Sequence, residues 1–122
     1  MPTTDTTTRV PAYVRERRKV RAMILEQHQD EAGQLDPAAL VAAAVARRRE
    51  VERLEALVRG GTEADPPTQE LRDELTQAQW WDHHYQSALR DEIPAWSAAL
   101  ANARTGFSKT MTKAARSLGL AG

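Results

Sequence analysis

The sequence predicts an all-α protein of four helices, the middle two folded back on each other as a long antiparallel hairpin. Apolar residues recur in alternating steps of three and four along two long segments, which is the spacing of one helix face. A break rich in glycine and proline, residues 60–67, separates these segments. We therefore expect helices at about 11–32, 37–59, 67–93 and 95–118. They would form one domain (11–122) after a flexible, threonine-rich arm (1–10).

The first predicted helix has an unusual order of charges. Pro11 suits its first turn, and Gly33 is placed to end it in the left-handed conformation. Its first half is basic and its second half acidic, the reverse of the order that the helix dipole favours. Two interpretations fit: a solvated charged face, or a surface that binds anions or a partner. The residues that could contact nucleic acid there are Arg15, Arg17, Arg18, Lys19 and Arg21.

The second helix has the clearest boundaries in the chain. Asp36 can cap its N-terminus, and Pro37 occupies the first helical position. Gly60 and Gly61 stop it. At about 1.5 Å per residue, a continuous helix of this length is roughly 35 Å long.

The register of the hairpin follows from residue numbers. If Val58 opposes Leu71, each later facing pair has the same sum of numbers, down to Leu40 opposite Leu89. The basic residue of the first seam, Arg47, then faces the acidic residue of the second, Asp82. We predict that these two form a structural ion pair that fixes the register, because that is the best-attested use of such a pair.

The third and fourth helices carry the candidate protein interface. Trp80 and His84 point away from the hairpin seam and need cover from the fourth helix or from another chain. Pro94 either starts the fourth helix after a tight turn or kinks one long helix. The fourth helix has an apolar stripe that includes Trp96, with basic residues opposite it. The predicted interface residues are Trp80, His84, Trp96, Lys109, Lys113 and Arg116.

Composition restricts the protein class. The 122 residues have a net charge of zero, contain no cysteine, and show no apolar run approaching the roughly 20 residues of a membrane span. The N-terminal segment lacks the apolar core of a signal peptide. We therefore expect a soluble protein without membrane association, in the cytoplasm or in a virion assembled there.

The sequence lacks the residue patterns of the common catalytic sites. His83 and His84 are adjacent, so on a helix they diverge by about 100° and cannot hold one metal ion together. No phosphate-binding loop, nucleophile elbow or His-Glu-x-x-His motif is present. We expect no enzyme and no cofactor. A bundle metal site would need three or more of His28, His83, His84, Glu70 and Glu74 close together.

These observations favour a non-enzymatic assembly or adaptor protein that joins copies of itself, as a homo-oligomer, or a larger complex. A structural or head-to-tail adaptor subunit of a phage-like particle suits the size and helical content, as an analogy of class. The alternative is a small nucleic-acid-binding or packaging accessory that uses basic segments 9–21 and 104–116. Convergence of the two segments on one face would favour nucleic acid, whereas a basic patch matched to an acidic patch of a neighbouring copy would favour assembly.

Overall fold

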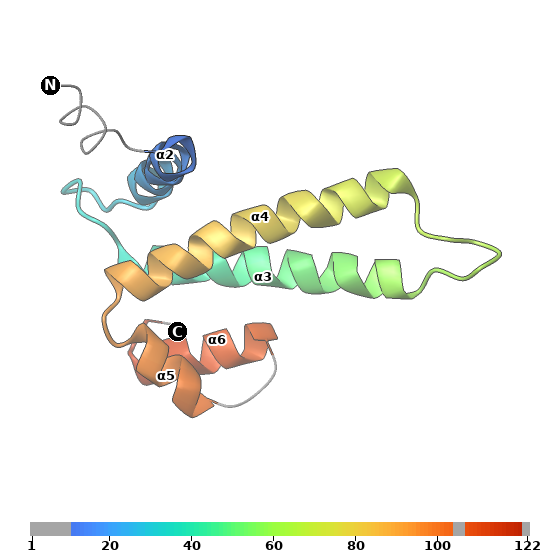
Figure 1. Ribbon diagram of the computed structural model, residues 1–122. Helices are drawn as coiled ribbons and strands as arrows, with labels where there is room; N and C mark the ends of the chain where they lie inside the picture. Colours follow the sequence, from blue (N-terminus) through green and yellow to red (C-terminus); the bar gives the residue numbers. More distant parts are fainter. Residues whose placement is uncertain (1–10, 104–106, 121–122) are drawn as a thin grey trace, which may run out of the picture.

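The computed structural model describes residues 11–103 and 107–120, with the side chain of Phe107 left out. Within these ranges the protein is all-α, as predicted. Its helices are α2 (Ala12–Gln27), α3 (Pro37–Arg59), α4 (Gln69–Glu92), α5 (Trp96–Ala103) and α6 (Phe107–Ser117). Figure 1 shows α3 and α4 as a long antiparallel hairpin, with α2 on one side and α5 and α6 on the other. The predicted arm, 1–10, lies outside the described residues.

A side-chain cap begins each of the two hairpin helices, and the one on α3 is the predicted Asp36. The Asp36 carboxylate accepts hydrogen bonds from the backbone N–H groups of Ala38 and Ala39 at 3.1 and 3.3 Å, which caps α3. The Thr68 hydroxyl accepts one from the N–H of Leu71 at 3.1 Å, which caps α4. The predicted bounds of the second helix, 37–59, are confirmed.

The hairpin loop depends on one glycine. A Cβ atom on Gly61 would lie closer to the Pro67 Cδ atom than real side chains approach, whereas one on Gly60 would meet only ordinary contacts. The loop backbone therefore requires glycine at position 61, where it passes close to Pro67 before α4 begins.

The core lies at the end of the hairpin away from this loop. Ile24, Leu40, Ala88, Leu89 and Ala115 are fully buried there. They come from α2, α3, α4 and α6, so this end of the hairpin is covered on both sides.

The predicted fourth helix, 95–118, is wrong: two short helices, α5 and α6, occupy this range and pack against each other. Residues 104–106, between them, lie outside the described part of the chain. Their sequence includes Gly106, which has low helix propensity. Folding back also buries Trp96, Ala103, Met111 and Ala114 in one cluster, which a straight helix would spread along the surface.

Pro94 separates two helices and does not kink one. α4 ends at Glu92, and Ile93 has an extended conformation, with φ −119° and ψ 95°. A residue before proline is disfavoured in the helical region, which explains the boundary.

The first helix is shorter than predicted. α2 ends at Gln27, not near Ala32. Gly33 has the expected positive φ, 80°, but it lies in a turn organised by Asp30, whose carboxylate accepts hydrogen bonds from the N–H groups of Ala32 and Gln34.

An acidic side chain of α3 holds the start of α6. The Glu52 carboxylate accepts hydrogen bonds from the backbone N–H of Ser108 at 3.0 Å and from its hydroxyl at 2.6 Å. Negative charge at a helix N-terminus is favourable, so this contact both caps α6 and fixes it to the hairpin.

Candidate functional site

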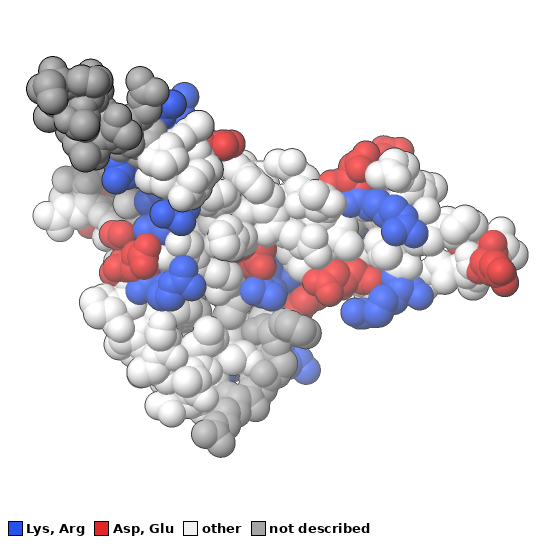
Figure 2. Space-filling view, in the orientation of Figure 1, with Lys and Arg blue, Asp and Glu red and all other residues white. Residues whose placement is uncertain are grey.

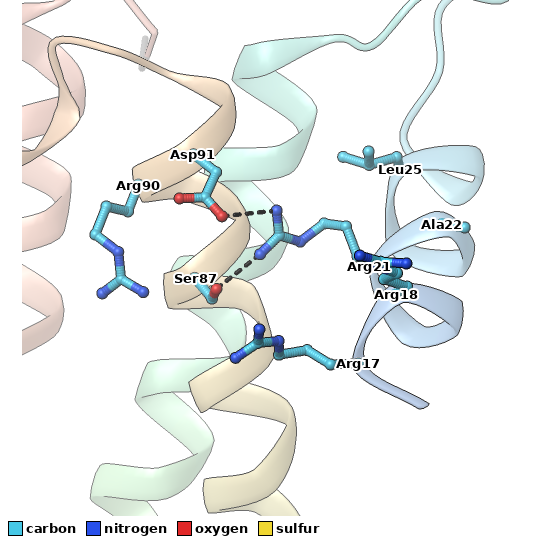
Figure 3. Close-up of a pocket in the computed structure, with 8 residues that line it drawn as sticks. All are labelled: Arg17, Arg18, Arg21, Ala22, Leu25, Ser87, Arg90 and Asp91. Carbon is cyan, nitrogen blue, oxygen red and sulfur yellow. Dashed lines mark hydrogen bonds and ion pairs between the residues drawn. The ribbon is translucent and has the colours of Figure 1, made fainter. Parts of the chain in front are cut away.

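A groove with a cavity volume of about 460 Å³ opens between α2 and α4 (Figure 3). The residues that line it, here called the basic groove, are Arg17, Arg18, Arg21, Ala22, Leu25, Ser87, Arg90 and Asp91. Four of the eight are arginines, so positive charge predominates among its lining side chains.

Arg21 joins the two walls of the groove. Its Nη1 atom lies 3.1 Å from Asp91 Oδ2 and 3.8 Å from Glu92 Oε2, and its Nη2 donates a 2.7 Å hydrogen bond to Ser87 Oγ. The side chain is only 20% exposed. Arg21, predicted to contact nucleic acid, is thus already engaged by α4 and serves to hold α2 in place.

The other two α2 arginines of the groove are exposed. Figure 3 shows Arg17 reaching from α2 toward α4, as Arg21 does, whereas Arg90 points away from α2. Within the described residues, neither Arg17 nor Arg18 has an ion-pair partner. Their guanidinium groups can bind carboxylates or phosphates of another molecule by donating hydrogen bonds to them.

One face of α4 runs along this side of the molecule. Trp80, His84, Ser87 and Asp91 follow helical spacing, so the outward face predicted for Trp80 and His84 continues into the groove. The ring centroids of Trp80 and His84 are 4.4 Å apart. Ser87 and Asp91 were not among the predicted site residues, although extending that face by two turns would have included them.

His84 lies in a positive environment. Burial lowers the pKa of its imidazole from the ordinary value of 6.5, and the charges of His83 and Arg21 lower it further. Glu16 opposes this shift, and Arg17 makes the smallest contribution, which also lowers the pKa. The predicted cover for this face, expected from the fourth helix or another chain, thus comes in part from α2. Trp80 still exposes 36% of its surface.

Exposed apolar side chains accompany the arginines on α2. Tyr13 is 69% exposed and Met23 39% exposed, although both are large. This combination of arginine and exposed aromatic or methionine side chains is typical of protein interfaces.

The predicted partner of Asp82 is wrong. Asp82 Oδ2 pairs with Arg48 Nη2 at 3.0 Å, and the Arg47 guanidinium carbon lies 4.8 Å from the Trp81 ring centroid and 5.4 Å from that of Tyr85. A guanidinium is attracted to aromatic faces, and two such rings lie opposite position 47. Pairing facing residues by a constant sum of residue numbers predicts the partner only to within about one position. Here Asp82 pairs with Arg48, the arginine next to the predicted Arg47.

The remaining predicted interface residues divide between core and surface. Trp96 is 2% exposed and belongs to the core, so it is not available to a partner. Lys109, Lys113 and Arg116 are exposed on α6. Because α6 packs on α3 and α2 packs on α4, the described parts of the two basic segments lie on opposite sides of the hairpin (Figure 1). Arg9 and Arg104 lie outside the described residues.

The histidines are not gathered around a metal site. The described residues contain no group of three or more His, Asp or Glu side chains that could hold a metal ion. His28 Nε2 instead lies 2.8 Å from the Tyr85 hydroxyl, and burial, followed by the charge of Arg47, lowers the pKa of its imidazole.

Among the described helices, none combines the length and the apolar composition that crossing a membrane requires.

Comparisons with protein-family models, with curated proteins and with solved structures found no match to this chain. The basis for a function is therefore the arrangement of its residues.

Proposed function

We propose that this protein is a non-enzymatic assembly or adaptor subunit that binds an acidic protein surface through the basic groove. The acidic surface can belong to another copy of this chain or to a different protein of a larger complex. A structural or head-to-tail adaptor subunit of a phage-like particle is the more specific proposal, supported only by size and helical content.

The observation that carries the proposal is the pair of exposed arginines, Arg17 and Arg18, held beside a groove of fixed shape. The Arg21 contacts with Ser87 and Asp91 tie α2 to α4, so the two free guanidinium groups are presented on an ordered surface. Preorganised charge of this kind lowers the entropy lost on binding and selects partners of opposite charge.

The separation of the basic segments favours assembly over the nucleic-acid alternative. A phosphate backbone is bound by several cations on one surface, and the exposed bases of α2 and α6 face different sides of the hairpin.

Size-exclusion chromatography with light scattering tests the proposal when absorbance is recorded at nucleic-acid and protein wavelengths. We expect a defined assembly free of nucleic acid, which Arg17→Gln with Arg18→Gln weakens. A monomer that carries nucleic acid, removed by high salt, would instead establish the alternative.

A further inference from the structure

We propose that the acidic surface bound by the basic groove is the loop end of the hairpin in a second copy of this chain. This loop end, residues 57–74, is here called the hairpin tip. The inference rests on the proposed function and adds the partner's identity: the chain assembles head to tail.

The hairpin tip has the charge that the groove lacks. Glu63, Asp65, Glu70, Asp73 and Glu74 are all exposed. The bases Arg59 and Arg72 reduce this negative charge without cancelling it. Figure 2 shows acidic side chains at the extreme end of the hairpin, while at the other end, around α2, basic side chains lie together with some acidic ones.

The hairpin tip also has apolar surface to bury. Leu57 is 49% exposed and lines a pocket of about 350 Å³ with Gly61, Pro66 and Leu71. On α2, the exposed Tyr13 lies one helical turn before the groove residue Arg17. Each surface therefore combines charge with uncovered apolar side chains, the composition of an interface that excludes water around its ion pairs.

The hairpin tip cannot reach the basic groove of its own chain. Arg21 fixes α2 near the C-terminal end of α4, and the loop lies at the opposite end of helices roughly 35 Å long. The contact must therefore join two copies. Because it joins two different surfaces, it can repeat from copy to copy as an open chain or a ring, or close as a twofold dimer when each of two copies places its hairpin tip in the other's groove.

The test uses the whole chain in light scattering over a range of concentrations, at about 50 mM and about 1 M salt, since added salt screens exposed charges. We expect the mass of the wild type to rise with concentration at low salt and to fall at high salt. A groove variant, Arg17→Gln with Arg18→Gln, and a tip variant, Glu63→Lys with Glu70→Lys, should each associate at least about fivefold more weakly.

Two controls isolate the contact. Lys109→Gln with Lys113→Gln changes the net charge as the groove variant does, but on the other side of the hairpin, and should associate like the wild type. Circular dichroism should show wild-type helicity for all variants, because every substituted side chain is exposed.

Mixing the two variants is the decisive step. The tip variant keeps an intact groove and the groove variant keeps an intact hairpin tip, so the mixture should form a 1:1 dimer that grows no further. An interface formed by one patch paired with itself would instead be weakened by only one of the two variants.

The outcomes separate this inference from the proposed function. Wild-type assembly that survives both variants, or variants that do not complement each other, would exclude the hairpin tip as partner while leaving protein assembly in place. A wild type that stays monomeric at every concentration would exclude self-recognition, and nucleic acid eluting with that monomer would overturn the proposed function as well.

Discussion

The two ends of the hairpin are built from the same pair of helices but have different neighbours. Toward the core, Leu40 and Leu89 face each other and are fully buried, because α2, α5 and α6 cover the pair. Toward the loop, Leu54 is still buried, but its seam neighbours Val58, Leu71 and Leu75 are only partly buried. Leu57, beside the seam, is half exposed. The same spacing of apolar residues thus gives a core at one end and an open surface at the other, since two helices alone cannot enclose their seam.

The largest expected effect breaks the core end. Leu89→Ala should lower the free energy of unfolding by about 3 to 4 kcal/mol, because it leaves a cavity in a fully packed cluster. The same substitution at the hairpin tip, Leu57→Ala, should cost less than about 0.5 kcal/mol in the monomer. Urea denaturation followed by circular dichroism measures both, and equal losses would show that the two ends are equally packed.

The ion pair in the middle of the hairpin should have the next largest effect. Asp82→Ala should cost about 2 kcal/mol, because it leaves Arg48 half-buried opposite an apolar side chain. Arg47→Ala should cost about 1 kcal/mol, from lost contact with the aromatic rings. In double-mutant cycles, Asp82 should couple to Arg48 more strongly than to Arg47, and the reverse would restore the constant-sum register.

The loop offers a matched pair of glycines. Gly61→Ala should destabilise by about 1 to 2 kcal/mol, since the new Cβ atom would collide with Pro67. Gly60→Ala should be neutral or slightly stabilising, because that residue has helical φ and ψ and room for a methyl group. Thermal unfolding compares the two, and a similar loss at both positions would contradict the predicted close approach.

The smallest effect is a pH dependence confined to the core end. The folded-state pKa values of His28 and His84 lie below 6.5, so the unfolded chain binds more protons and stability falls as pH drops below that value. The urea midpoint should therefore decrease between about pH 7.5 and pH 5.5. His28→Gln should flatten part of this slope, and a midpoint that rises on acidification would refute the assignment.

Much of the fold could be predicted because the signals are local. The Asp36 cap, the Thr68 start and the glycine stop of α3 act through neighbouring backbone groups, so they are legible in the sequence. The end of the chain follows the same logic: Gly119 has φ 71°, and the Leu120 N–H donates to the Ala115 carbonyl at 2.8 Å, as expected of a helix ending in glycine.

Less of the candidate site could be predicted. Trp80, His84 and the α2 arginines were identified from charge and helical spacing. Ser87 and Asp91 lie on the same face of α4, but their role in the site is visible only from the contacts that Arg21 makes with them across the groove. The stripe containing Trp96 indicated an apolar face without indicating whether the same chain would cover it.

The sequence by itself determined the helix class, the hairpin and most helix boundaries, because propensity, capping and periodicity depend on residues a few positions apart. Tertiary structure alone decided which arginine pairs with Asp82, that the last predicted helix folds into α5 and α6, and which bases remain free. Those outcomes depend on contacts between residues far apart in the chain, such as Glu52 with Ser108 and Arg21 with Asp91, where many side chains compete for one position and packing selects among them.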